Sequence, residues 1–158
     1  MNGFRPGIRR EGAVVDGIDH TPLFRALNED DLRKIDPYIG TIELDAGDVL
    51  FAEGDQSDFA AFVTDGQLEA VKKDFNNNEK IVSRFSAGTA IGEMALLDGL
   101  PRSATIRARS PASVTVLDRQ GLDAIIAAEP HVGVKILRHL ARTVSYNLRR
   151  TSNQLSDL

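Results

Sequence analysis

The sequence predicts a mainly β domain with helices at both ends, and three changes of pattern along the chain support this fold class. From Pro22 to about Pro37 the apolar residues follow a helical spacing. Residues 41–118 form short alternating segments separated by glycines. Helical spacing then returns and continues to the end of the chain. We therefore expect short N-terminal helices, about eight strands in a sandwich or barrel, and a long C-terminal helix.

The composition is that of one globular domain. The 158 residues are 42% hydrophobic and 27% charged, and a chain of this length buries roughly two thirds of its unfolded surface. Because there is no cysteine, disulfides, thiolate metal sites and cysteine nucleophiles are excluded. The sequence shows neither a signal peptide nor an apolar run of membrane-spanning length, so we expect a cytoplasmic protein. A net charge of -4 argues against direct DNA binding.

Each end of the domain has its own helical signals. Residues 1–21 carry no pattern and are predicted to be a flexible leader, so that the domain spans 22–158. Asn28, followed by acidic residues, predicts the N-cap of a short helix that ends near Pro37. The positions that predict one or two short helices here are Leu23, Phe24, Leu27, Leu32 and Ile35.

The central strands are recognised by apolar residues two positions apart. A polar turn, DFNNNE, and several glycines divide them at the spacing of β-sandwiches and barrels. The pairs that mark strands are Ile42 and Leu44, Val49 and Phe51, Ala60 and Phe62, Leu68 and Ala70, Ile81 and Ser83, and Val114 and Val116.

A short helix over about 120–128 is followed by Pro130, which suits the first turn of a second helix over about 130–156. Apolar residues in this second helix repeat every 3.5 positions, the period of a coiled-coil seam. The stripe could instead pack on the chain's own β-domain, but a reach of roughly 37 Å favours a partner helix. We expect a parallel homodimer. The seam consists of Leu137, Ala141, Val144, Leu148, Thr151, Leu155 and Leu158.

The stretch IGEMALLDGLPRSAT places both charge signs close together. Gly92 before a short helix predicts free backbone amides at Met94 and Ala95, which favour an anion. Arg102 offers a planar fork for phosphate oxygens, and Glu93 could accept a neighbouring sugar hydroxyl. A surface ion pair between Glu93 and Arg102 is the alternative. Spacing alone slightly favours the ion pair.

This stretch closely resembles the phosphate-binding cassette of cyclic nucleotide-binding domains, and the match runs without a gap through GEMALL and PRSAT. GDVLFAEGDQSDFAAFVTDGQLEAV is similar to the first hairpins of the family, and the final helix to its long closing helix. The resemblance covers about 22–158. It implies an eight-stranded jelly roll, also called a double-stranded β-helix, that senses a cyclic nucleotide without catalysing a reaction.

The resemblance also implies roles for single residues. Glu93 would accept the ribose 2'-hydroxyl and Arg102 would pair with the cyclic phosphate, while Thr151 and Ser152 on the closing helix would contact the base. The remaining implied ligand-binding positions are Gly92, Met94, Ala95 and Ser103 in the cassette, and Ala70, Val82 and Ser83 around the sugar and base. Cyclic AMP is the expected ligand, with cyclic GMP as the alternative, and no cofactor or metal is expected.

Two features limit what the resemblance implies. Asn147 stands where a basic residue is expected, which leaves the contacts of the closing helix open. The sequence given has neither a helix-turn-helix domain nor a second cassette, so we expect an unidentified effector protein as partner. Two alternatives stay open: a docking module that binds no nucleotide, and a regulatory fragment of a channel, transporter or enzyme.

Enzyme activity is not expected. A metal-dependent β-barrel needs two or three histidines and a carboxylate that converge inside the barrel. The three histidines, His20, His131 and His139, all lie outside the predicted strands. Neither a Ser-His-Asp arrangement nor a phosphate-binding P-loop is present in the sequence.

Overall fold

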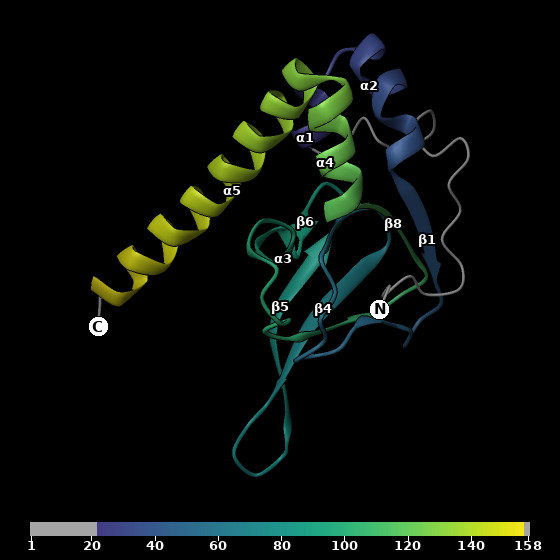
Figure 1. Ribbon diagram of the computed structural model, residues 1–158. Coiled ribbons are helices and arrows are strands. Elements are labelled where there is room, and N and C mark those ends of the chain that lie inside the picture. The colour runs from purple at the N-terminus through teal and green to yellow at the C-terminus, as the bar shows by residue number, and fades with distance from the viewer. Residues whose placement is uncertain (1–21, 157–158) are drawn as a thin grey trace.

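The computed structural model describes residues 22–156, and in this part of the chain eight strands form two four-stranded antiparallel sheets. The strand orders are β1-β8-β3-β6 and β2-β7-β4-β5, so the short strand β6 and the exposed strand β5 each lie at the edge of a sheet. This arrangement is the jelly roll that the resemblance implied (Figure 1). The strands are β1 (Gly40–Leu44), β2 (Val49–Phe51), β3 (Phe59–Asp65), β4 (Gln67–Lys73), β5 (Glu79–Ser86), β6 (Ala90–Ile91), β7 (Thr105–Ala108) and β8 (Ala112–Asp118).

The predicted helices are present at both ends of the β-domain. Asn28 caps α2 as expected: its side chain accepts from the Asp31 amide at 2.8 Å, and Asp31 accepts from the Asn28 amide at 3.2 Å. A single 3₁₀ turn (Asp36–Tyr38) follows α2 at Pro37. The helices are α1 (Pro22–Arg25), α2 (Glu29–Ile35), α3 (Glu93–Asp98), α4 (Arg119–Ala128) and α5 (Pro130–Ser156).

Two apolar clusters stabilise the fold, one on each side of the sheet that contains β3. Phe62 belongs to the helix-side cluster and packs edge-on against Phe24 of α1, with ring centroids 5.3 Å apart. Ala61 and Val63 belong to the cluster between the sheets. Because helices cover one face of β3 and the second sheet covers the other, its apolar run is buried on both faces.

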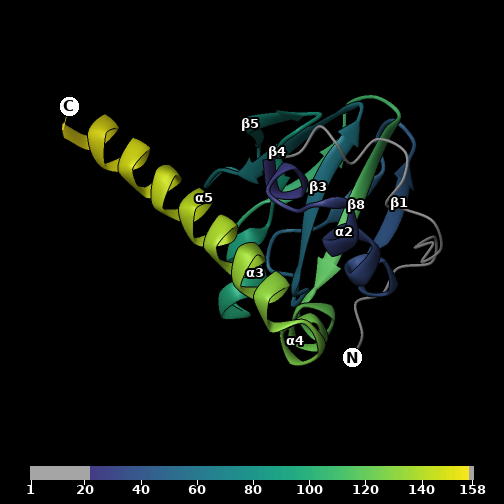
Figure 2. The same cartoon turned by 90° about the horizontal axis from the view of Figure 1, so that it is seen from above.

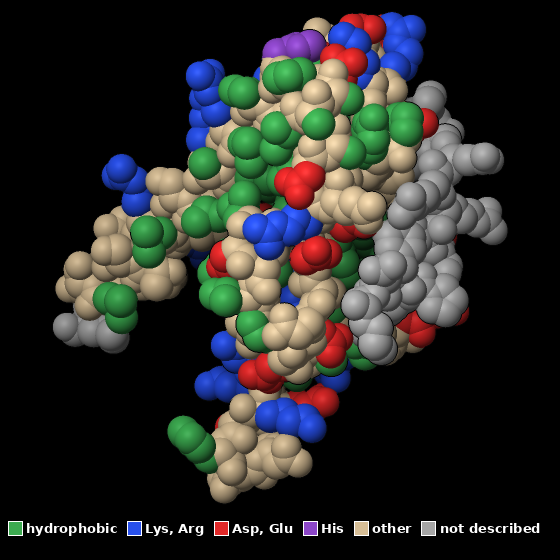
Figure 3. Space-filling model, viewed as in Figure 1, with side chains coloured by type: hydrophobic (Ala, Val, Ile, Leu, Met, Phe, Trp, Pro, Cys, Tyr) green, Lys and Arg blue, Asp and Glu red, His purple; other side chains and the backbone are tan. Residues whose placement is uncertain are grey.

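Helix α5 is packed at its start and largely exposed at its end. Its buried residues lie between Val132 and Leu140, and Lys135 donates to the buried carboxylate of Asp31 at 2.7 Å. Beyond Leu140 the helix leaves the body of the domain (Figures 1 and 2). The space-filling view shows the same projection (Figure 3).

The predicted seam lies largely in this projecting part. Leu137 and Val144 are half-buried, whereas Ala141, Leu148, Thr151 and Leu155 are exposed, and Leu158 lies outside the described residues. The alternative that the whole stripe packs on the chain's own β-domain is therefore wrong for the distal half of α5. The predicted leader, 1–21, also lies outside the described residues.

Candidate functional site

The cassette, residues 92–103, begins at a position that requires glycine. Gly92 has a φ of 76° and forms the N-cap of α3, which ends at Gly99 with a φ of 70°. A Cβ atom at Gly92 would collide with Nη1 of Arg102 and would lie 3.3 Å from the carbonyl oxygen of Phe59. The glycine therefore allows both the left-handed turn and the close approach of the arginine.

Arg102 is buried, with 4% of its surface exposed, and its guanidinium group points into the protein. Nε donates to Oγ of Ser57 at 2.7 Å, and Nη2 donates to the carbonyl oxygen of Phe59 at 2.6 Å. Nη1 donates to the carbonyl oxygen of Gly92 at 3.2 Å, and the group stacks 3.9 Å from the ring centroid of Phe51. The interpretation of Arg102 as half of a surface ion pair is therefore wrong.

The guanidinium group retains capacity for an anion. None of its three acceptors is a carboxylate, and these bonds use three of its five N–H groups. Burial lowers the pKa of Arg102 to about 10, against the opposing effect of the nearby carboxylates Asp58 and Asp55, so the group stays charged at neutral pH. A buried cation with two free N–H groups suits a phosphate.

Glu93 is also buried, with 7% of its surface exposed, and burial raises the pKa of its carboxyl group. Its Oε1 accepts from Nδ2 of Asn147 at 3.3 Å, a contact between the cassette and α5. The sequence left the contacts of the closing helix open, because Asn147 stands where a basic residue is expected. In the structure Asn147 does contact the cassette. Glu93 contacts the closing helix, not Arg102, among the described residues.

The other predicted site residues divide into buried and exposed groups. Ala70 is buried and pairs with Ser83 across β4 and β5, while Val82 is the extra residue of the bulge before the next pair. Within the cassette, Ala95 is buried, but the side chains of Met94 and Ser103 are exposed.

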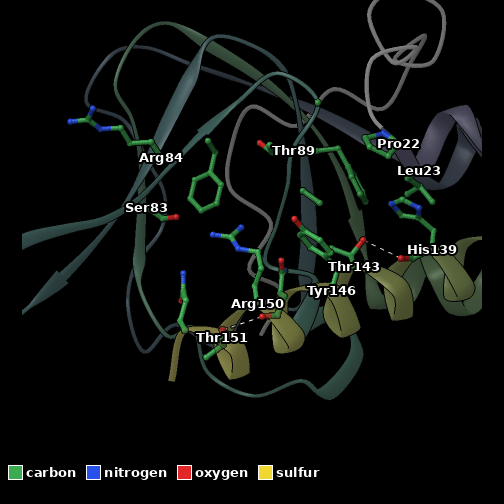
Figure 4. Close-up of a pocket in the computed structure, with 16 residues that line it drawn as sticks. Pro22, Leu23, Ser83, Arg84, Thr89, His139, Thr143, Tyr146, Arg150 and Thr151 are labelled. Carbon is green, nitrogen blue, oxygen red and sulfur yellow. Dashed lines mark hydrogen bonds between the residues drawn. The ribbon is translucent and has the colours of Figure 1, made fainter. Parts of the chain in front are cut away.

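A cavity of about 580 Å³ lies between α5 and β5 (Figure 4). Ser83 and Thr151 both line it, so the structure brings these two predicted residues together from opposite walls. The Thr151 hydroxyl already donates to the carbonyl oxygen of Asn147 at 3.0 Å. The described lining includes Asn147 but not Glu93, Arg102 or Ser152, so Asn147 links the cavity to the cassette.

Sequence reasoning missed the residues that hold the guanidinium group of Arg102 in place. Ser57 and Phe59 come from the loop and strand after β2, and that loop is tied to the cassette by the bond from the Arg102 amide to the Asp55 carbonyl at 3.0 Å. The polar run GDQSD was a signal that this loop could contact a ligand or a buried polar group. Nothing in the neighbouring sequence connects the loop with Arg102, which is more than forty residues away.

Within residues 22–156 no helix is both long and apolar enough to cross a membrane. The same part of the chain holds no group of three His, Asp or Glu residues placed to bind a metal.

Comparison with known proteins agrees with the fold and the cassette. Residues 41–129 match the family model for the cyclic nucleotide-binding domain. The chain is 31% identical over 109 residues to the cAMP-dependent protein kinase regulatory subunit of Emericella nidulans. The aligned region covers 69% of this chain and 26% of that protein.

Two solved structures are also similar. A cyclic nucleotide-binding domain from Methylobacillus flagellatus is 27% identical with a TM-score of 0.75, covering 81% of this chain and 72% of that one. The Thermus thermophilus catabolite activator protein is 25% identical with a TM-score of 0.74, covering 86% and 62%. The chain spans 26% to 59% of the length of curated relatives such as the kinase subunit and a mycobacterial cAMP-activated regulator. The family match and the buried cassette lead to one conclusion: this chain belongs to the cyclic nucleotide-binding domain family.

Proposed function

We propose that the chain is a cytoplasmic, non-catalytic sensor of cyclic AMP, in which α5 transmits the state of the cassette. The hydrogen bond between Glu93 and Asn147 carries this proposal, because it joins the ligand-binding loop to the projecting helix. In the ligand complex, the two free N–H groups of Arg102 bind the cyclic phosphate, and Glu93 accepts the ribose 2'-hydroxyl.

In this proposal the carboxylate of Glu93 couples ligand binding to the position of α5. A ribose hydroxyl that donates to Glu93 competes with, or reorients, the Asn147 amide that already donates there. A ligand shifts an equilibrium only by its different affinity for the two states, so this contact is a place where binding energy can change the position of α5.

The output surface is the exposed seam of α5. Leu148 and Leu155 are both more than 60% exposed, and they lie in the predicted coiled-coil stripe. We propose that this stripe forms a parallel homodimer, which an effector protein then recognises. The chain spans 26% of the kinase subunit and 59% of the mycobacterial regulator. This partial match also supports the alternative that the chain is the regulatory part of a larger channel, transporter or enzyme.

Isothermal titration with cyclic AMP and cyclic GMP tests the proposal. Replacing Arg102 with leucine should cost about 2–5 kcal/mol of binding, as removal of one partner from a buried charged pair does. Because Arg102 also stabilises the fold, R102K provides a second variant that keeps the charge but loses the fork. The exposed Arg149, replaced by leucine, is the control.

The results separate the candidate functions. Wild-type binding that survives in R149L and is lost in R102L and R102K supports the sensor. Wild-type protein that binds neither nucleotide would instead support the docking module that keeps only the fold. Faster hydrogen exchange of the distal amides of α5 in N147A than in the wild type, without ligand, would support the coupling role of Asn147.

A further inference from the structure

The hairpin formed by β4 and β5 extends beyond the rest of the β-domain, and its turn is closed by backbone hydrogen bonds (Figure 1). The Asp74 amide donates to the carbonyl oxygen of Asn78 at 2.9 Å, and the Asn77 amide donates to the carbonyl oxygen of Asp74 at 3.0 Å. The Asp74 carboxylate accepts from the amides of Asn76 and Asn78, both at 2.9 Å. These bonds fix the turn without help from apolar packing.

Phe75 lies in this turn and is fully exposed, with a relative exposure of 110%. Neither apolar cluster of the domain includes it, so the ring does not stabilise the fold. Of the other exposed large apolar residues in the described part of the chain, the next, Leu148, is only 67% exposed. One exposed apolar side chain is ordinary in itself. The position of this ring on a projecting turn makes it available to a partner.

Three lysines lie directly behind the turn: Lys72 and Lys73 on β4, and Lys80 on β5. Lys72 and Lys80 are paired across the two strands, so their side chains leave the same face of the hairpin. Like charges in this register repel each other and destabilise a hairpin. Glu79 does not compensate them, because it is bonded to Arg107 at 2.8 Å.

The repulsion between these lysines is not relieved within the described residues. Neither Lys72 nor Lys80 forms a hydrogen bond or ion pair there. The Asp74 carboxylate is occupied by two backbone amides. The space-filling view shows basic side chains on the same projection (Figure 3). An anion bound from outside would relieve the repulsion, and the turn would place an apolar ring beside that anion.

We propose that the tip of this hairpin binds an anionic phospholipid surface. Lys72 and Lys80 contact the headgroups, and Phe75 enters the boundary between headgroups and acyl chains, where aromatic rings are favoured. A flat surface suits a projecting tip that has no groove of its own, whereas a protein partner would have to supply a pocket for the ring. Because the chain carries a net charge of -4, the attraction is confined to this tip.

This surface is separate from the proposed nucleotide site. The cavity lined by Ser83 and Thr151 includes neither the lysines nor Phe75. The contact is peripheral, since it needs only one ring and a pair of charges at the surface of the bilayer.

F75W tests insertion of the ring, because the chain has no tryptophan of its own. The full chain is mixed with phosphatidylcholine vesicles that contain about one third phosphatidylserine, and its fluorescence emission should shift to the blue. Vesicles of phosphatidylcholine alone should leave the emission unchanged.

Cosedimentation with the same vesicles measures the affinity. K72Q/K80Q should weaken the binding about 25-fold, since each lysine near an anionic surface contributes roughly fivefold. F75A should weaken it about tenfold, as loss of a partly buried apolar ring does.

Two matched controls remove the same groups elsewhere. R138Q/R149Q takes two exposed positive charges from α5, and V134A shortens an apolar residue that is 47% exposed; both should bind as the wild type does. In urea denaturation K72Q/K80Q should be no less stable than the wild type, because it removes a repelling pair. Its weaker binding therefore cannot come from unfolding.

Several outcomes would overturn the proposal. These are equal binding to the two kinds of vesicle, an F75W emission that vesicles leave unchanged, and equal effects of the two double variants. Binding to neither vesicle would refute it in favour of a protein partner. Soluble glycerophosphoserine, at the headgroup concentration of the vesicles, should not displace the protein; full displacement would show a site for a small anion and refute a lipid surface.

The nucleotide proposal succeeds or fails separately. K72Q/K80Q should lose the vesicles but bind cyclic AMP as the wild type does, because neither lysine lines the cavity or belongs to the cassette. A wild-type protein that binds the anionic vesicles but no nucleotide would refute the sensor and leave the lipid contact standing.

Discussion

Replacing Arg102 with leucine is expected to destabilise the fold even when no ligand is present. The change removes three hydrogen bonds and leaves Ser57 and the carbonyls of Gly92 and Phe59 without their donor. Hydrogen bonds from a charged donor contribute roughly 1.5–3 kcal/mol each. Against this, the fall of the Arg102 pKa from 12.5 to about 10 represents roughly 3 kcal/mol of unfavourable burial, at about 1.4 kcal/mol per tenfold change.

The difference between these contributions predicts a loss of about 1.5–6 kcal/mol in the free energy of unfolding. Urea denaturation of the ligand-free protein measures it, with R149L as the exposed control and R102K expected to lie between R102L and the wild type. An R102L protein within about 0.5 kcal/mol of the wild type would refute the reasoning, because surface substitutions have effects of that size. It would mean that the buried contacts of Arg102 only offset the cost of burying its charge.

Four further predictions concern stability and assembly. In urea denaturation, G92A should lower the free energy of unfolding by about 2–4 kcal/mol. G54A should lower it by about 1 kcal/mol, because Gly54 has a φ of 86° but open space around an added Cβ. E93Q should raise the free energy of unfolding at pH 7, because burial raises the pKa of Glu93 and so disfavours its charged form, and the gain should shrink as the pH falls through that raised pKa. Burial opposes ionisation of Asp31, but its bonds to Lys135 and Asn28 lower its pKa below 3.8. Denaturation at several pH values should therefore give the wild type a higher free energy of unfolding than D31N at pH 7. This difference should shrink as the pH falls below 3.8. Truncation after Arg142 removes most of the exposed seam and should give a monomer by light scattering, while a persistent dimer would place the interface elsewhere.

Local patterns predicted the elements well because they record the faces that each element buries. The alternation of the strands, the Asn28 cap and the position of Pro130 all appear in the structure as expected. Two strands were not located. β6 has only two residues and is too short to show an alternation. β7 has four residues, and its one apolar pair, Ile106 and Ala108, was not recognised although it shows the same alternation as the other strands.

The candidate site was predicted in part. The helix that starts at Glu93, directly after Gly92, follows from the sequence of the cassette alone. The inward direction of Arg102 could not be predicted, because its acceptors at Ser57 and Phe59 are more than forty residues away and depend on how the sheets close. The contact between Glu93 and Asn147 spans 54 positions and depends on the angle at which α5 leaves the domain.

The exposed part of α5 can amplify a small movement at the cassette. With its last buried residue at Leu140 as a pivot, the helix extends sixteen residues to Ser156, about 24 Å, whereas Asn147 lies only seven residues, about 10 Å, from the same point. A tilt that shifts Asn147 by 2 Å, enough to break its bond to Glu93, moves the tip by more than twice as far. In the proposed sensor, the loss of one hydrogen bond would therefore appear as a displacement of about 4–5 Å, nearly the length of one helical turn, at the exposed tip of α5.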